Sequence, residues 1–570
     1  MEQLTERFQA ALGKAFGDEY ADADPVIRPS QFADFQANAA LALAKKLGEQ
    51  PRAVAQRIVD ALDLDGIAGA PEISGPGFVN VRLDPAWIAA EVSGLDERLG
   101  VPTQEPQTIP VDYSAPNVAK EMHVAHLRTT VVGDALVRTL EHLGHHVIRQ
   151  NHVGDWGTMF GMLIEHLLAV GEDSPEAQLM VTDPNTFYAA ARAEFDSDED
   201  FATRSRGRVV KLQAGDADTL RLWHELVDLS KQYFNRVYST LGVTLTDADL
   251  AGESTYNDEL ADICDELEAA GIATMSDGAL CVFLDGYTGR EGKPQPLIIR
   301  KSDGGYGYAT TDLATIRHRV RDLGADRCLY VIGAPQALHL NMVWDTARKA
   351  GWLPDDVEVV HVQIGNVLGE DRKLLRTRAG NPLKLMALLD EAVTKARAVI
   401  DEARPDLDPE VRAAIAPQVG IGAVKYADLA VAHDSEYVFD LDRMVSLTGN
   451  TGPYLQYAAA RIRSIFRSAG LDPRQPDGRI LLTEPAERAL ALALLDFGDV
   501  VVQVGDLLEP HRLCTYLFDL AQHFSAFYEQ CPVLKADSET RASRLALCAA
   551  TLAVLDQGLD LLGIARPAQM

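Results

Sequence analysis

The sequence has few cysteines and no long apolar run, and both features indicate in which cellular compartment the protein works. None of the cysteines forms a CxxC pair, and the six are scattered at Cys264, Cys281, Cys328, Cys514, Cys531 and Cys548. Such usage is typical of a reducing compartment with buried thiols. No stretch approaches the roughly 20 apolar residues that span a bilayer, and the opening MEQLTERFQAALGKAF lacks the apolar block of a secretion signal. We therefore expect a cytoplasmic protein without a membrane partner.

The sequence also lacks an excess of positive charge, internal repeats and low-complexity tracts. Its net charge of −31 argues against indiscriminate binding to nucleic acid. Attraction to phosphate is local, however, so basic stripes on an acidic protein can still bind RNA. With 47% hydrophobic and 24% charged residues, the composition is that of a globular protein. A length of 570 residues exceeds a single core and predicts about four domains.

The chain is organised around the stretch from Asp112 to Gly161. A short apolar strand, Ile109 to Tyr113, ends in a loop containing Pro116. A helix follows, with apolar residues at helical spacing up to a terminating glycine, and a second strand then leads into another loop. Strand, helix and strand over so few residues predict a parallel βαβ unit, whose ligands bind at the carboxyl ends of the strands.

The start of this helix carries His123 and His126, followed by Arg128. We expect free backbone N–H groups and the positive end of the helix dipole there, which together suit a phosphate. Histidine pairs three residues apart also occur on ordinary surfaces and in metal sites. No third ligand stands at metal spacing, so we expect no metal site of the protein's own.

The residues around this helix resemble one family. His123-Val124-Ala125-His126 is similar to the HIGH signature of class I aminoacyl-tRNA synthetases. The longer stretches SAPNVAKEMHVAHLRTT and NHVGDWGTMFGMLI resemble those of arginyl-tRNA synthetases. The similarity extends from the FADFQAN element near the amino terminus to the closing LGI, and so covers nearly the whole chain.

The resemblance implies three units. Residues 1–105 would be an α+β amino-terminal domain that binds the tRNA elbow. Residues 108–384 would be a Rossmann-like α/β class I catalytic domain with a helical insertion at about 170–250. Residues 385–570 would be an all-α anticodon-binding helix bundle, as their amphipathic spacing also indicates. We expect the apolar strands CVFL at 281 and PLIIR at 296 to continue the nucleotide-binding fold. The basic run RSRGRVVK in the insertion predicts a solvated helix face, with a contact to the tRNA acceptor arm as the alternative.

Candidate arginine ligands are spread over several segments. Tyr308 and Asp312 stand four residues apart and would share one face at a helix start. An aspartate there most simply complements the helix dipole. The resemblance instead assigns both residues, with Gln336, to the substrate guanidinium, which a carboxylate can bind in fork geometry. It assigns Asp112 and Asn117 to the rest of the amino acid, and Asp112 stands where the family also uses glutamate.

Candidate ATP ligands come from two signatures. The resemblance implies that His123 and His126 bind the phosphates, and that Ala125 lies against the adenine, where the family ordinarily has glycine. The stretch GNVLGEDRKLLRTRAG is similar to the second signature loop of the family. The resemblance implies that Lys373, Arg376 and Arg378 are the cations that bind the pyrophosphate. It implies that Gly380 is a retained glycine of the ATP site. The glycine that often precedes the lysine is missing.

Candidate tRNA ligands lie in the outer units. Tyr454, Arg461 and Arg463 cluster on one predicted helix, and such side chains suit unstacked anticodon bases. From the residues alone, we would interpret the tyrosines as core residues and the arginines as a solvated basic face. The resemblance to an anticodon-binding domain favours tRNA binding instead. Gln36 and Asn38 match the element that binds the tRNA elbow, although Asn38 could equally be a helix cap.

The implied activity is that of an arginine–tRNA ligase. Arginine would react with ATP, accompanied by Mg²⁺, to give arginyl-adenylate, and would then pass to the 3′ end of tRNA(Arg). The expected state is a monomer. The alternatives are a non-catalytic tRNA-binding paralogue and an enzyme that serves a specialised pathway. The intact histidines and the cations of the loop favour an active enzyme.

Overall fold

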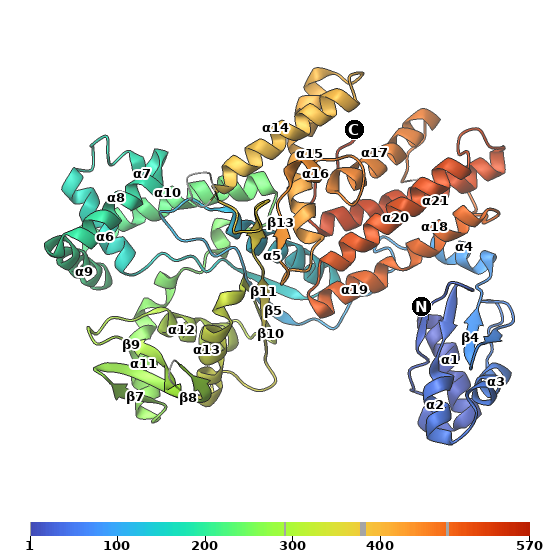
Figure 1. Ribbon diagram of the computed structural model, residues 1–570, viewed down its shortest axis with the longest axis horizontal. Helices are drawn as coiled ribbons and strands as arrows, with labels where there is room; N and C mark the ends of the chain where they lie inside the picture. Colours follow the sequence, from blue (N-terminus) through green and yellow to red (C-terminus); the bar gives the residue numbers. More distant parts are fainter. Residues whose placement is uncertain (1, 290–291, 377–382, 475–477) are drawn as a thin grey trace.

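The structure is a computed structural model that describes residues 2–289, 292–376, 383–474 and 478–570. Figure 1 shows an amino-terminal unit at one end, a central α/β region, and a carboxyl-terminal group of helices. No helix in these described ranges combines the length and apolarity needed to cross a membrane. All six cysteines are buried and unpaired.

The amino-terminal unit is an antiparallel sheet covered by helices, with strand order β1-β2-β4-β3. Gly75 and Gly77 supply the left-handed backbone between β3 and β4. Asn38 occupies the N-cap position of α2, but its side chain makes no capping hydrogen bond. The alternative interpretation of Asn38 as a capping side chain is therefore wrong. The elements are α1 (Glu2–Phe16), β1 (Ile27–Pro29), β2 (Phe35–Ala37), α2 (Ala39–Leu47), α3 (Pro51–Ala61), β3 (Glu72–Ser74), β4 (Phe78–Val81) and α4 (Pro85–Ser93).

The centre of the molecule is a four-stranded parallel sheet ordered β11-β10-β5-β6. The predicted βαβ unit is confirmed as β5 (Thr108–Asp112), α5 (Val124–Leu143) and β6 (His146–Gln150). The chain then adds β10 (Arg327–Gly333) and β11 (Glu358–Ile364) on the other side of β5. The carboxyl end of β5 is therefore a topological switch point, where α/β sheets bind ligands.

Close packing of α5 on this sheet requires a residue without a side chain. A Cβ built on Gly133 would lie 2.4 Å from the side chain of Tyr113, which is fully buried just after β5. No carbon atom can approach that closely, so glycine lets the helix and the strand touch. Gly144 ends α5 in the left-handed conformation, as its sequence position predicts.

The insertion is helical, as expected. In its basic run, the Arg208 Nε lies 2.7 Å from a carboxylate oxygen of Glu165 on α6. Part of this run is therefore engaged within the protein and is not a wholly solvated face. The helices are α6 (Thr158–Val170), α7 (Leu179–Thr182), α8 (Pro184–Ser197), α9 (Glu199–Gln213) and α10 (Ala217–Leu241).

The strands near 281 and 296 do not continue the parallel sheet, contrary to the expectation from sequence. They are β8 (Ala279–Thr288) and β9 (Pro294–Arg300), which form a separate antiparallel sheet with β7 (Ala273–Ser276). The short connection between β8 and β9 explains the error, because a parallel crossover needs about a dozen residues or more. The helices α11 (Leu260–Ala269), α12 (Tyr308–Arg321) and α13 (Ala337–Lys349) lie beside this sheet (Figure 1).

The carboxyl-terminal region is helical, as predicted. A two-stranded parallel pair, β12 (Val367–Leu368) with β13 (Tyr437–Val438), joins the base of the second signature loop to it. The helices are α14 (Leu385–Ala403), α15 (Pro409–Leu429), α16 (Leu441–Met444), α17 (Gly452–Ala469), α18 (Pro485–Leu495), α19 (Phe497–Leu507), α20 (His511–Gln530) and α21 (Ser538–Leu561).

The first unit contacts the last group of helices. Asp34 Oδ2 lies 2.5 Å from the Arg488 guanidinium on α18, which also donates to the Leu83 carbonyl at 2.9 Å. A Cβ on Gly498, at the start of α19, would lie 2.2 Å from the Gly100 carbonyl oxygen, so glycine permits this contact. The two ends of the chain are thereby joined beside the catalytic region.

Candidate active site

Two histidines cap the amino-terminal end of α5. His123 has an extended backbone (φ −117°, ψ 174°), and its Nδ1 accepts the N–H of Ala125 at 3.3 Å. The N–H of His123 donates in turn to Nδ1 of His126 at 3.1 Å, and the ring centroids are 4.2 Å apart. This arrangement is a capping box built from imidazoles in place of a hydroxyl and a carboxylate.

The cap determines which nitrogen of each imidazole ring carries the proton. Because each Nδ1 accepts a backbone N–H, the ring proton lies on Nε2. Burial, and then the charge of Lys120, lowers the pKa of His123. Burial, and then His123, lowers the pKa of His126 to about 3. Both rings are therefore neutral at physiological pH, and each offers an Nε2–H to a ligand oxygen.

The expectation of free N–H groups at the start of α5 is wrong for the first three residues of the helix. The N–H of Val124 donates to the Leu383 carbonyl at 3.1 Å, and that of His126 donates to the His123 carbonyl at 2.9 Å. The N–H of Ala125 is used by His123. Tertiary pairing and the imidazole cap thus consume these donors, and the remaining attraction for phosphate comes from the ring Nε2–H groups and the helix dipole.

The loop between β5 and α5 is strained. Ser114, Ala115 and Ala119 have φ values of 69°, 45° and 59°, a conformation that costs such residues about 1–3 kcal/mol each. Asn117 forms a bridge with Gly154, where a Cβ would lie 2.5 Å from Asn117 Oδ1. This contact requires glycine at 154 and holds Asn117 where it lines a small cavity with both histidines.

The segment after the second signature pairs with the first signature. Lys384 forms an antiparallel bridge with His123, and the N–H of Leu385 donates to the Met122 carbonyl at 2.9 Å. Lys384 Nζ also lies 2.6 Å from the Glu121 carboxylate. The two signatures, far apart in sequence, therefore meet at the end of α5.

The second signature loop carries exposed cations. Lys373 and Arg376 are both exposed, whereas Arg378 and Gly380 lie outside the described residues. Arg372, at the position before Lys373, has φ 57°. Glycine would adopt that backbone without strain, so the missing family glycine is replaced here by an arginine in a strained conformation.

Tyr308 begins α12 and Asp312 follows four residues later, so the predicted helix start is confirmed. Asp312 Oδ2 lies 2.5 Å from His339 Nε2 and its Oδ1 lies 3.8 Å from His152 Nε2. The hydrogen bond to Asp312 raises the pKa of His339. Tyr308 is 75% exposed. Gln336 is exposed at the end of a short 3₁₀ turn that follows β10.

Glu253 is a site residue that sequence reasoning missed. Burial, and then the charges of Asp312 and Asp155, raises its pKa to about 8. Glu253 in turn contributes, after burial, to the raised pKa of Tyr308. The charges of Asp312 and Asp155 both act on Glu253, and the combined negative charge of the three carboxylates favours a cation. No motif or spacing marks Glu253 in the sequence, and only the fold brings it beside Asp312.

Asp112 has a partner inside the protein. Its Oδ2 accepts from the buried Arg319 guanidinium at 2.8 Å, while Oδ1 is buried without a hydrogen-bond partner. Arg319 also lies over the Tyr330 ring at 4.7 Å. Asp112 therefore stands at the switch point with one carboxylate oxygen paired to Arg319 and the other buried without a partner.

The candidate tRNA ligands occupy the two outer units. Arg461 on α17 lies between the rings of Tyr457 and Tyr528, at 4.8 Å and 5.2 Å from their centroids. Arg463 is held internally by the Asp556 carboxylate at 2.5 Å. The Tyr454 hydroxyl contacts Ser525 at 3.2 Å. In the first unit, Gln36 pairs opposite Asn80 across the sheet, and Asn38 Oδ1 is buried without a partner.

Comparison with family models accounts for most of the chain. A model of the class I tRNA synthetase (R) catalytic domain matches residues 91–441. A model of the arginyl tRNA synthetase N-terminal domain matches residues 2–83, and one of the DALR anticodon binding domain matches residues 455–570. The chain belongs to the arginyl-tRNA synthetase family.

Known arginyl-tRNA synthetases resemble the chain over its full length. The arginine–tRNA ligase of Thermobifida fusca is 71% identical over 570 residues, covering 100% of this chain and 99% of its own. That of Frankia casuarinae is 55% identical over 568 residues, covering 97% and 96%. The crystal structure of arginyl-tRNA synthetase from Plasmodium falciparum has a TM-score of 0.83 at 29% identity, covering 100% of this chain and 99% of that one. The predicted family, fold class and activity are confirmed: this arginyl-tRNA synthetase is an arginine–tRNA ligase.

Ala125 departs from the usual first signature of arginyl-tRNA synthetases. Its side chain is exposed at the start of α5, and the resemblance predicts that adenine lies against the backbone there. An added methyl in a packed site costs roughly 1–3 kcal/mol. We expect Ala125→Gly to lower the KM for ATP or raise kcat several-fold, as measured by steady-state kinetics at varied ATP. An equal or slower glycine variant would show that the site accommodates the methyl.

Proposed function

We propose that the synthetase activates arginine between its two signatures. The arginine carboxylate attacks the α-phosphate of ATP and pyrophosphate leaves. His123 and His126 donate Nε2–H to the phosphates, while Lys373, Arg376 and Arg378 neutralise the leaving pyrophosphate. The pairing of the two signatures at the end of α5 supports this assignment. Positioning and charge stabilisation suffice for such a reaction.

The adenine side of the ATP site is assigned to the backbone at Ala125 and to Gly380. Mg²⁺ would arrive bound to the ATP phosphates and neutralise part of their charge. In the second step, the terminal ribose hydroxyl of tRNA(Arg) attacks the arginyl carbonyl and AMP leaves. The state we propose is a monomer in the cytoplasm, divided at the boundaries expected from sequence (1–105, 108–384 and 385–570).

Asp312, with Glu253 beside it, is assigned to the substrate guanidinium. A guanidinium supplies five N–H donors in a planar fork, which a carboxylate can accept in pairs. Tyr308 and Gln336 flank the same group, and Asn117 and Asp112 bind the amino-acid end. The observation that carries the assignment is the raised pKa of Glu253, whose first cause is burial and whose next cause is Asp312. Such a cluster of carboxylates needs a cation for balance, and arginine supplies one.

Arginine affinity should rise with pH because of Glu253. A pKa of about 8 in the free enzyme leaves Glu253 mostly protonated at neutral pH, and a bound guanidinium favours its ionised form. Binding therefore releases a proton, and the affinity increases until the pH exceeds the pKa of free Glu253. We expect the KM for arginine to fall about eightfold between about pH 7 and pH 8.5. In Glu253→Gln, which cannot ionise, most of this dependence should vanish; an unchanged profile would exclude Glu253 from the pocket.

The outer units are assigned to tRNA. Gln36 and Asn38 would contact the elbow, and Tyr454, Arg461 and Arg463 the anticodon. We expect Arg461→Ala with Arg463→Ala to weaken tRNA binding and to flatten the log–log salt slope by about one for each phosphate that no longer has a cationic partner. Filter binding over a salt series measures both effects. Because Arg463 is paired with Asp556, Arg461→Ala alone should cause most of the loss in tRNA affinity. If the double variant binds tRNA as tightly as the parent, both arginines have only a structural role.

A further inference from the structure

The second signature loop begins as a short hairpin that stands on β12. The N–H of Leu375 donates to the Val367 carbonyl at 3.1 Å, and the N–H of Gly369 donates to the Lys373 carbonyl at 2.8 Å. Lys373 itself is exposed. Because these hydrogen bonds tie the backbone of Lys373 to β12, the position of β12 decides where the cation stands.

A segment far away in the sequence holds β12. This support segment, residues 432–439, follows α15 and contains β13, which pairs in parallel with β12. The N–H of Phe439 donates to the Leu368 carbonyl at 2.8 Å. Asn366 Nδ2 donates to the Glu436 carboxylate, also at 2.8 Å. The support segment is therefore the base of the hairpin that carries Lys373.

His433 makes the first of these contacts, at the point where the chain leaves β11. Its Nδ1 lies 2.8 Å from the Gln363 carbonyl oxygen, and its own carbonyl accepts the N–H of Gly365 at 2.8 Å. Because a carbonyl oxygen can only accept, Nδ1 carries the ring proton and donates it. His433 thus binds the backbone on both sides of Ile364 and fixes the direction in which the chain enters β12.

The contact at residue 365 leaves no room for a side chain. A Cβ built on Gly365 would lie 2.6 Å from the Ser435 carbonyl oxygen and 2.8 Å from that of Asp434. Glycine permits this close approach of two backbone segments. The end of β11 and the support segment are therefore in direct contact, and a displacement of one must move the other.

The support segment is also fixed to the first-signature helix. Arg128 on α5 donates to the carbonyl of Ser435 at 2.6 Å and to that of Ala432 at 3.4 Å. Its guanidinium lies 5.2 Å from the Tyr437 ring centroid. The helix that the two histidines cap therefore also carries the base on which Lys373 stands.

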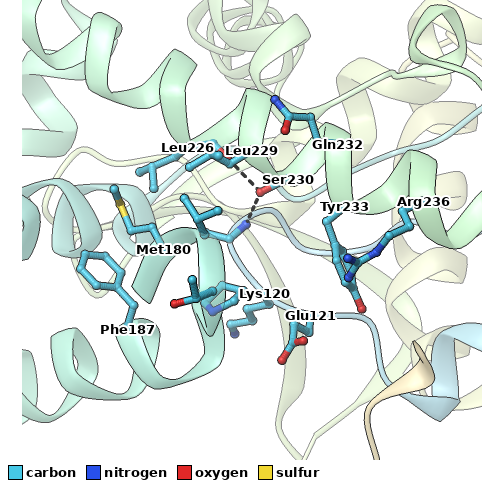
Figure 2. A pocket seen from close by; sticks show the side chains of 14 residues that line it. Lys120, Glu121, Met180, Phe187, Leu226, Leu229, Ser230, Gln232, Tyr233 and Arg236 are labelled. Carbon is cyan, nitrogen blue, oxygen red and sulfur yellow. Dashed lines mark hydrogen bonds between the residues drawn. The ribbon is translucent and has the colours of Figure 1, made fainter. Parts of the chain in front are cut away.

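The histidine end of α5 is held separately, from the side of the insertion. Ser230 Oγ accepts the N–H of Ala119 at 2.8 Å, and the Tyr233 hydroxyl accepts the N–H of Met122 at 3.2 Å. Figure 2 shows Ser230 and Tyr233 on α10, with dashed hydrogen bonds at Ser230. Because these contacts come from α10, a change at His433 should move the second signature and leave the first in place.

We propose that His433 is a positioning residue for arginine activation, which sets where Lys373 meets the pyrophosphate. It acts through the direction of the chain at Gly365 and not by binding a substrate. A displaced cation stabilises the transition state less, because electrostatic catalysis depends on groups that are already in place. The proposal rests on the assignment of Lys373 to the leaving pyrophosphate.

The test separates the donated hydrogen bond from the imidazole ring. His433→Ala removes the donor, whereas His433→Asn keeps an N–H at the position of Nδ1. In ATP–pyrophosphate exchange with tRNA(Arg) present, we expect His433→Ala to lower kcat/KM for pyrophosphate roughly three- to tenfold, the effect of one hydrogen bond. His433→Asn should restore most of the loss, and the KM for arginine should stay at the parental value in both variants.

The matched control is His146→Ala. His146 is exposed at the start of β6, at the opposite end of the sheet from the ligand-binding edge, so its removal should leave exchange unchanged. Thermal unfolding of each variant identifies any loss of fold. A His433→Ala enzyme that unfolds at a lower temperature but keeps parental exchange would give His433 a structural role only, as would an equal loss in His433→Ala and His433→Asn.

A double-mutant cycle tests whether His433 acts through Lys373. Lys373→Ala should lower exchange, and His433→Ala added to it should cause little further loss, because an absent cation cannot be misplaced. Additive losses would overturn the proposal. If Lys373→Ala itself exchanges like the parent, the assignment of Lys373 to pyrophosphate fails. A loss in Lys373→Ala with parental exchange in His433→Ala overturns the positioning role alone.

Discussion

Asp312→Asn should lower kcat/KM for arginine by roughly 30-fold to several-thousand-fold. The substitution keeps the shape of the side chain and removes the charge that faces the guanidinium. Truncating one partner of a buried, hydrogen-bonded charge pair costs about 2–5 kcal/mol. The measurement is aminoacylation at varied arginine and saturating ATP and tRNA. The KM for ATP should change by less than a factor of two, because the histidine cap does not involve α12.

The matched control is Asp322→Asn, which removes an exposed carboxylate at the other end of the same helix. Among the residues that the structure describes, Asp322 forms an ion pair with His318 alone, at 2.6 Å, so its removal should leave arginine kinetics unchanged. His339 offers a further check, since it shares Asp312 with the substrate. If Asp312→Asn retains arginine kcat/KM within twofold of the parent, Asp312 does not belong to the pocket.

Arg128→Met should destabilise the catalytic region by about 3–5 kcal/mol, the cost of leaving a buried charge without its partner. Both side chains of the Arg128–Asp428 pair are fully buried, with Nε and Oδ1 3.0 Å apart. Arg128 also donates to the carbonyls of Ser435 and Ala432. It thereby ties the first-signature helix to α15 and to the chain just before β13. The variant should unfold at a markedly lower temperature, as circular dichroism would record.

A second substitution separates charge from packing. Arg128→Met combined with Asp428→Leu replaces the pair by apolar groups, an exchange that is often neutral or stabilising. The double variant should recover most of the stability, although the two carbonyls no longer have their donor. Burial raises the pKa of Asp428 against the effect of Arg128, so Arg128→Met alone should make that carboxyl take up a proton. A double variant less stable than Arg128→Met would assign the destabilisation to packing instead of charge.

Much of the catalytic fold could be predicted because it is local. The strand, helix and strand around α5 are marked by spacing and by Gly144, and the structure confirms them. The sheet that contains β8 and β9 could not be assigned correctly from its residues, because apolar strands look alike whichever sheet they join. The length of the connection between them carries the information, since it is too short for a parallel crossover.

The chemistry of the site is less accessible from sequence. The pattern places His123 and His126 at a helix start, but it cannot show that their Nδ1 atoms are used as caps or that Leu383 occupies a helix N–H. The charge balance of Asp112 depends on Arg319, more than 200 positions away. The charge of Asp312 helps to raise the pKa of Glu253, and Asp556 forms the ion pair of Arg463. Each of these properties arises from tertiary contacts, which residue spacing does not record.

The contact between Asp34 and Arg488 also sets an order of assembly during synthesis. The two residues are 454 positions apart, so at about 5–20 residues per second the ribosome needs roughly 20–90 s to make the second after the first. Because domains generally fold as units during synthesis, we expect the amino-terminal unit to fold before α18, the partner of Asp34 and of the Leu83 carbonyl, has been made. In a nascent chain that ends before α18, the first unit would lack Arg488, the residue to which it binds. Closure of the molecule is thus one of the last events of its synthesis, and the glycine contact between residues 100 and 498 is completed in the same step.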